Sequence, residues 1–157
     1  MVSLRLTPLV KSSNYSTKVS DMNLSISEFE SLLPMQLHDY MEPLLATSNF
    51  DVTPEQYAHL KTRLTEYDQY RQVYSMLVCS RHNFADFLPI LLDKLGNKEG
   101  SVVCAVINIL NEIPENLIDS NLIEQLTTST FESRWKTNIY LLQQSLKRKL
   151  SSSRTKR

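Results

Sequence analysis

Residues 83–96 have the sequence NFADFLPILLDKLG, which carries the most regular helical pattern in the chain. From Phe84 onward, apolar side chains recur at positions i, i+3, i+4, i+7, i+8 and i+11 of one helix face. Asn83 is a preferred residue type for an N-cap, and Gly96 is placed to end the helix in the left-handed conformation. Pro89 predicts a local bend rather than a break. The stretch therefore predicts an amphipathic helix that packs on a core.

Helical patterns continue toward the N-terminus of this stretch. Ser27 and Glu30 have the spacing of a capping box, in which each side chain bonds to the backbone N–H of the other residue. Thr53 followed by Pro54 combines an N-cap with a favoured first helical residue. Thr65 is expected to open a further helix in the same way.

Toward the C-terminus, residues 101–113 are apolar on more than one face. This pattern indicates a central buried helix, although the β-branched content leaves a strand as the alternative. A shorter helix is expected over residues 117–126. The longest is expected over residues 131–150, preceded by a capping box of Ser129 and Glu132.

The helical periodicity covers most of the chain, and the 157 residues include only two glycines. The sequence therefore predicts an all-α fold, a compact bundle of six to eight short antiparallel helices with a long C-terminal helix. The expected domains are a flexible leader at 1–24, the bundle at 25–128, the long helix at 129–150, packed on or projecting from the bundle, and a basic disordered tail at 151–157. The core is expected to include Phe84, Phe87, Leu88, Leu91, Val106, Ile107 and Leu110.

The net charge of zero conceals an uneven distribution along the chain. All 17 acidic residues lie between Asp21 and Glu132, where the net charge is −11, while the two ends carry +3 and +8. The protein is therefore an acidic body with basic ends. The sequence also lacks an apolar stretch long enough to span a membrane or to act as a secretory signal, which predicts an intracellular protein.

The sequence has no pattern typical of catalysis, cofactor binding or metal binding. Glycine-rich phosphate loops and the motifs of metalloproteases and serine hydrolases are absent. Cys79 and Cys104 lie in apolar runs and are expected to be free core thiols. Cys79 with His82 lacks the second ligand pair of a closed zinc site. We therefore expect a non-enzymatic protein with no catalytic residues, no cofactor and no metal ion.

Two groups of residues are candidates for binding. Four tyrosines fall within two adjacent helices, where their spacing favours a half-buried core over a binding surface. The basic end of the last helix is the stronger candidate, because its leucines would project beyond the bundle as apolar side chains surrounded by positive charge. The predicted partner-binding residues are Leu146, Lys147, Arg148, Lys149, Leu150, Arg154, Lys156 and Arg157. The alternative is that this helix covers the bundle and its cations offset the helix dipole.

Residues 37–110 contain four stretches with the pattern of a known family. They are YMEPLL at 40–45, NFDVT at 49–53, YDQYRQ at 67–72 and FADFL at 84–88. In these stretches the chain resembles a caspase-recruitment domain, a six-helix member of the death fold. The resemblance implies homotypic assembly in apoptotic or immune signalling.

These observations favour a protein–protein interaction module with protein partners, homotypic or heterotypic. The first alternative is a small helical subunit of a larger nuclear complex. The second is a nucleic-acid-binding protein that uses its basic C-terminal end. The basic tail places the protein in the nucleus or cytoplasm, ahead of the mitochondrion that an acid-free leader could indicate.

Overall fold

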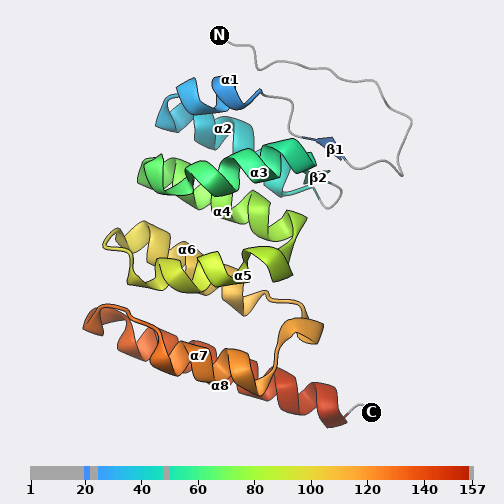
Figure 1. Cartoon of the computed structure of the whole chain (residues 1–157), viewed down its shortest axis with the longest axis vertical. Helices are drawn as coiled ribbons and strands as arrows, with labels where there is room; N and C mark the ends of the chain where they lie inside the picture. Colours follow the sequence, from blue (N-terminus) through green and yellow to red (C-terminus); the bar gives the residue numbers. More distant parts are fainter. Residues whose placement is uncertain (1–19, 22–24, 48–49, 156–157) are drawn as a thin grey trace. The chain divides into compact units, whose positions relative to one another are not determined.

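The structure is a computed structural model that describes the backbone of residues 20–21, 25–47 and 50–155 and the side chains of residues 25–47 and 50–152. The chain divides into two compact units, one ending at His82 and the other beginning at Asn83. Both units are built from α-helices (Figure 1), so the predicted all-α class is confirmed. The sequence analysis placed residues 25–128 in one bundle, and the boundary between the units lies inside this stretch.

Unit 1 contains helices and one short pair of strands. β1 pairs in parallel with β2, with Ser20 opposite Phe50. In chain order the described elements are β1 (Ser20–Asp21), α1 (Ile26–Ser31), α2 (Pro34–Leu45), β2 (Phe50–Asp51), α3 (Pro54–Arg63), the 3-10 turn η3 (Leu64–Glu66) and α4 (Gln69–His82).

Of the three helix starts expected in unit 1, the one at Thr53 is confirmed and two are displaced. Thr65 lies within the 3-10 turn η3 rather than at the start of α4, which begins at Gln69 after Asp68, whose Oδ1 accepts a hydrogen bond from the Arg71 N–H at 2.9 Å. The Thr53 hydroxyl accepts a hydrogen bond from the Gln56 N–H at 3.1 Å, and the Gln56 side chain accepts one from the Thr53 N–H. The capping box at α1 is made by Ser25 and Glu28 rather than by Ser27 and Glu30, so that prediction was wrong by two residues. Glu30 does not take part in this cap, because its carboxylate bonds to side chains of α3 and of the loop before α4.

The core of unit 1 lies between α4 and the two helices that it contacts, α2 and α3. α1 adds Phe29, whose ring meets that of Tyr67 edge to face at 5.9 Å between centroids. Leu37, Met41, Leu60, Met76 and Cys79 are each fully buried. Of the four clustered tyrosines, Tyr57, Tyr67 and Tyr74 are buried, as the core interpretation requires, while Tyr70 is exposed.

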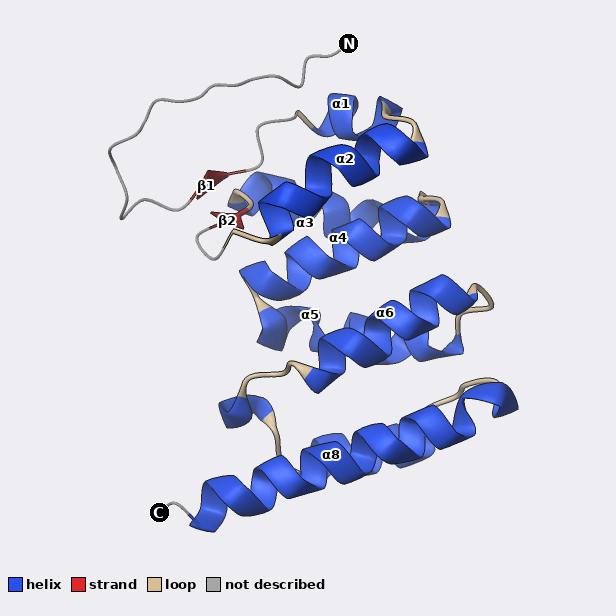
Figure 2. Cartoon of the chain, turned by 180° about the vertical axis from the view of Figure 1, so that it is seen from behind, coloured by secondary structure: helices blue, strands red, loops and turns tan. Residues whose placement is uncertain are grey.

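Unit 2 consists of two helix pairs, α5 with α6 and α7 with α8, in which α6 contacts α8. α5 and α7 lie toward the viewer in Figure 1, and α6 and α8 lie toward the viewer in Figure 2, which shows the opposite side. In chain order the elements are α5 (Phe84–Asp93), η4 (Lys94–Gly96), α6 (Gly100–Asn111), η5 (Glu115–Leu117), α7 (Ser120–Thr128), η6 (Ser133–Trp135) and α8 (Lys136–Thr155).

Residues 83–96, which have the most regular helical pattern in the sequence, contain α5 as expected. The Asn83 side chain accepts a hydrogen bond from the Asp86 N–H at 3.1 Å, and α5 continues through Pro89 to Asp93. Gly96, however, does not have a positive φ, so the predicted left-handed stop was wrong. A Cβ at this position would lie 3.1 Å from the Thr130 carbonyl oxygen, so close backbone approach is the physical reason for a glycine.

α6 is the central helix of unit 2, and the alternative of a strand at this position is excluded. Val106, Ile107 and Leu110 are buried, as are Phe87 and Leu91 of α5. Phe84 and Leu88 are half-buried, so the predicted core is confirmed at five of its seven positions. Cys104 lies exposed on α6, which corrects its assignment to the core.

The end of unit 2 differs from the expected boundaries. Ser129 is the C-cap of α7 and Glu132 precedes the 3-10 turn η6, so the capping box predicted for these two residues was wrong. α8 begins at Lys136 rather than near residue 131, and it continues to Thr155, beyond the expected end at residue 150. Residues 151–155, assigned to the tail, are therefore helical in the structure.

Candidate interaction surface

The inward face of α8 fixes this helix to the rest of unit 2. Ile139, Leu142 and Leu146 recur at spacings of three and four residues and are 2%, 1% and 0% exposed. Gln143 lies on the same side, and its Nε2 donates hydrogen bonds to the Ile123 carbonyl at 3.2 Å and the Thr127 hydroxyl at 2.6 Å. Contacts with both α6 and α7 leave the opposite face of α8 uncovered by unit 2.

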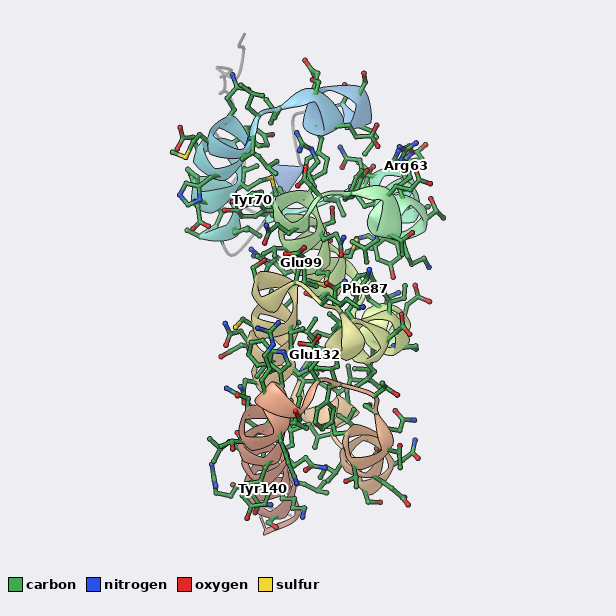
Figure 3. The ribbon with its side chains drawn as sticks, turned by 90° about the vertical axis from the view of Figure 1, so that its left-hand side faces the viewer. Arg63, Tyr70, Phe87, Glu99, Glu132 and Tyr140 are labelled. Carbon is green, nitrogen blue, oxygen red and sulfur yellow. The ribbon has the colours of Figure 1, made fainter. Side chains whose placement is uncertain are left out.

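The outward face of α8 combines apolar and basic side chains. Tyr140, labelled in Figure 3, is 57% exposed and Leu141 is 58% exposed. Lys147 and Arg148 are also exposed. Seven residues make nearly two full turns, so each cation lies on the same side of the helix as the apolar residue seven positions before it. We call Tyr140, Leu141, Lys147 and Arg148 the outer face of α8.

The structure places the predicted partner-binding residues in three different environments. Leu146 is fully buried, so its expected projection beyond the bundle was wrong. Leu150 is half-buried, and the Lys149 ammonium donates a hydrogen bond to the Asn111 carbonyl. Lys147 and Arg148 face outward as expected. The side chain of Arg154 and all of Lys156 and Arg157 lie outside the described residues, so their predicted role stays a prediction.

The sequence analysis missed Tyr140 and Leu141, which supply the exposed apolar area of this surface. They directly follow Ile139 and precede Leu142, so four consecutive apolar residues stand at 139–142. A helix that packs on one side only can bury two of these four, because successive residues are about 100° apart around the axis. The four consecutive apolar residues at 139–142 therefore indicate in the sequence that two apolar side chains stay exposed.

A second surface feature of unit 2 is a groove between α5 and α7, with a volume of about 330 Å³. Leu88, Leu92, Leu117 and Leu122 supply its apolar side chains. Asn116, Asn121 and Gln125 add carboxamides, and Asp119 adds a carboxylate whose Oδ1 accepts from the Leu122 N–H at 2.8 Å. We call this feature the α5–α7 groove.

Unit 1 contains a cluster of titratable side chains around Glu30. The Glu30 carboxylate accepts hydrogen bonds from the Tyr67 hydroxyl at 2.8 Å and from His59 Nε2 at 3.2 Å. It also forms an ion pair at 3.1 Å with Arg63, a residue labelled in Figure 3, which in turn pairs with Glu66 at 3.0 Å. Burial raises the pKa of Glu30, but these hydrogen bonds and the Arg63 charge outweigh burial and hold it below its ordinary value.

A second cluster in unit 1 joins α2 to α4. The Tyr74 hydroxyl donates a hydrogen bond to Glu42 at 3.0 Å and lies 2.8 Å from His38 Nδ1. A hydroxyl has one proton, so His38 must donate through Nδ1 in this arrangement. Burial and the Glu42 carboxylate raise the pKa of Tyr74 to about 12. The Tyr74 hydroxyl therefore links the His38 ring to the Glu42 carboxylate through two hydrogen bonds.

Neither cluster in unit 1 has the composition of a metal site, and within the described residues His, Cys, Asp and Glu nowhere gather in threes able to hold an ion. Burial raises the pKa of the Cys79 thiol to about 12, with Lys61 opposing it weakly, so Cys79 is not poised as a nucleophile. The helices of the described stretches are also too short or too polar to cross a membrane.

Comparison with known proteins identifies no relative. No family model matches the chain, and neither the curated proteins nor the solved structures include a significant match.

Proposed function

We propose that this protein is a non-enzymatic interaction module that docks an acidic partner protein through the outer face of α8. The observation that carries the proposal is the exposure of Tyr140 and Leu141, 57% and 58%, on a helix that has five cations and no acidic residue. Apolar side chains surrounded by polar ones have the anatomy of a protein interface. Tyrosine in particular is enriched among residues that dominate binding energy.

The charges of this surface define the chemistry of the partner. Exposed Lys147 and Arg148 attract an acidic surface and orient it during encounter, whereas the apolar pair supplies the desolvated contact. An amphipathic segment with one apolar side and acidic flanks fits both properties. A nucleic acid fits less well, because residues 21–133 carry a net charge of −11 that repels a polyanion.

The proposal is tested by isolating bound proteins with the tagged full chain and three variants. Tyr140→Ala with Leu141→Ala removes the apolar contact, and Lys147→Glu with Arg148→Glu reverses the charge. Leu33→Ala with Met35→Ala is the matched control, because these unit 1 side chains are 65% and 70% exposed. We expect one partner to bind the wild type and the control but to lose at least about tenfold in affinity with either α8 variant, since truncating an aromatic anchor costs about 2 kcal/mol or more.

Two results would contradict the proposal. The first is a partner that binds all variants equally. The second is salt-sensitive retention of the wild type on DNA or RNA that Lys147→Glu with Arg148→Glu abolishes while no protein partner depends on Tyr140 and Leu141. That result would assign the basic end of the chain to nucleic-acid binding instead.

A second candidate function follows from the resemblance of residues 37–110 to a caspase-recruitment domain, which implies homotypic assembly of a signalling adaptor. The observation that favours it is the order of the four matching stretches in this region. Its consequence is self-association that does not involve α8. Sedimentation of the full chain with reversed charges in α8 tests it, because assembly through residues 37–110 survives that change.

A further inference from the structure

The two layers of unit 2 carry charges of opposite sign. Residues 83–93 and 111–128, which include α5 and α7, contain six acidic residues and no basic one. α8, in the other layer, contains five basic residues and no acidic one. Figures 1 and 2 show the two layers of this unit from opposite sides. Unit 2 therefore presents an acidic surface and a basic surface that complement each other.

The acidic layer also holds the α5–α7 groove, whose lining includes one carboxylate, three carboxamides and a proline. Pro89 lines this groove and has no N–H, so the carbonyl of Ala85, another lining residue, lacks the donor four residues ahead of it. Proline in a helix interior is strongly disfavoured relative to alanine. Broken local rules of this kind concentrate at functional sites, and the groove lined by Pro89 also holds the Asp119 carboxylate.

We propose that the α5–α7 groove binds the outer face of α8 from a second copy of this chain. The inference rests on the proposed function, because it identifies the acidic partner of α8 as this groove. Leu88, Leu92 and Leu117 are half-buried and offer apolar area for Tyr140 and Leu141. The exposed carboxylates of Glu115 and Glu124, on the elements that line the groove, attract Lys147 and Arg148.

The contact has to form between copies rather than within one. α8 is held by its inward face against α6 and α7, with Leu146 fully buried, so its outer face cannot turn toward the groove of its own unit. The two surfaces are different patches of the same molecule, which makes the contact heterologous. A heterologous contact leaves one free groove and one free α8 on every dimer, so assembly continues into larger species or closes as a ring.

Sedimentation velocity of the full chain at about 0.05 M and about 0.5 M salt tests the proposal, because screening lengths fall with salt. The groove variant is Glu115→Lys with Glu124→Lys, and the α8 variant is Lys147→Glu with Arg148→Glu. Asp39→Lys with Lys98→Glu serves as the matched control, since both side chains are exposed and lie outside the two surfaces. Circular dichroism of each variant serves to check that its helices are retained.

We expect the wild type and the control to form concentration-dependent assemblies at low salt that dissociate at high salt. Each variant alone should sediment as a monomer. An equimolar mixture of the two variants should restore assembly, because each groove then meets an α8 of opposite charge on the other variant. Combining all four substitutions in one chain should restore assembly with reversed charges.

A wild type that stays monomeric at low salt overturns the inference, as does assembly that either variant leaves unchanged. So does a mixture of variants that fails to assemble. If the wild type is monomeric while a separate partner still requires Tyr140 and Leu141, the inference fails and the proposed function stands. If self-assembly depends on both surfaces and no other protein binds the outer face of α8, the groove of a second copy is the only partner of α8 that the results support.

Discussion

The central helices of the two units bury different kinds of residue. α4 of unit 1 buries Arg71, Gln72, Ser75 and Ser80 beside its apolar residues. α6 of unit 2 buries six residues, all of them apolar. Buried polar groups need partners, and unit 1 supplies them for three of these four residues. Arg71 donates to the Phe29 carbonyl at 3.3 Å, Gln72 to the Tyr67 carbonyl at 2.8 Å and Ser80 to the Leu77 carbonyl at 3.0 Å, whereas the buried Ser75 hydroxyl has no partner among the described residues.

The same contrast holds for ion pairs. In unit 1, Arg63 pairs with Glu30 and Glu66, and His82 lies 2.9 Å from Asp51. In unit 2, Arg134 pairs with Glu132 at 2.8 Å, while the segments around α5 and α7 carry acidic residues and α8 carries only cations. Charges used to hold a fold together are less available to a partner. This contrast supports placing the proposed interaction surfaces on unit 2.

The largest expected effect concerns the apolar core of unit 2. Leu110→Ala removes a fully buried side chain from α6 and should lower the free energy of unfolding by about 2 to 5 kcal/mol through lost burial and a cavity. Urea denaturation followed by circular dichroism measures the change. A loss below about 1 kcal/mol would show that α6 is not the packed centre of this unit.

A smaller effect is expected in the polar network of unit 1. Glu30→Gln weakens an acceptor of two hydrogen bonds and an ion pair, so the variant should lose about 1 to 3 kcal/mol near neutral pH. The pKa of Glu30 lies below its ordinary value of 4.5 in the folded protein. The carboxylate therefore stabilises the fold above that pH, and its contribution disappears as the pH falls through the folded pKa.

Urea denaturation across an acidic pH series checks this prediction. The wild type should lose more stability than Glu30→Gln on acidification, and the two proteins should converge at low pH. Parallel curves with a constant difference would show that the charge of Glu30 does not carry its contribution.

The link between α2 and α4 should contribute less, because His38 and Glu42 are both more than half exposed. Tyr74→Phe removes the hydroxyl that bonds to both residues and should cost about 0.5 to 1.5 kcal/mol. Thermal unfolding of the variant beside the wild type measures the cost. Tyr70→Phe is the matched control, since Tyr70 is 51% exposed, and an equal loss in both variants would contradict a specific role for the Tyr74 hydroxyl.

The smallest effect on stability is expected where we propose the largest effect on binding. Leu141→Ala changes an exposed side chain of α8 and should alter the free energy of unfolding by no more than about 0.5 kcal/mol. Leu142→Ala, at the next position but 1% exposed, should cost about 2 to 5 kcal/mol. Equal destabilisation by both would mean that Leu141 is packed and unavailable to a partner.

The sequence correctly predicted features, such as N-caps, that depend on residues within one helical turn of each other. The caps at Thr53 and Asn83 are confirmed, because a side chain three residues from its amide acts within one turn. The helix over 100–111 is confirmed in spite of its β-branched residues. Where two similar signals competed, as at Ser25 and Ser27, the sequence could not rank them, because Glu30 was engaged by residues 29 and 37 positions away.

The sequence predicted the positive charge of the candidate surface but not its exposed apolar residues. Composition alone placed the cations of 134–157 together, since no packing can change which residues a segment contains. Which apolar residues of α8 stay exposed depends on the rotation of the helix against α6 and α7. Leu146 and Leu141 are chemically identical, and their opposite burial, 0% and 58% exposed, follows from that rotation.

The sequence by itself thus determined the helical class, the principal caps and the separation of acidic from basic segments, because these depend on residue type and on spacings within one or two turns. The tertiary structure alone decided where the chain divides, at His82 and Asn83, and that α5 and α7 frame a groove. It also decided which side of α8 faces outward. Contacts between residues far apart in the chain set all three, and short-range periodicity carries no information about such contacts.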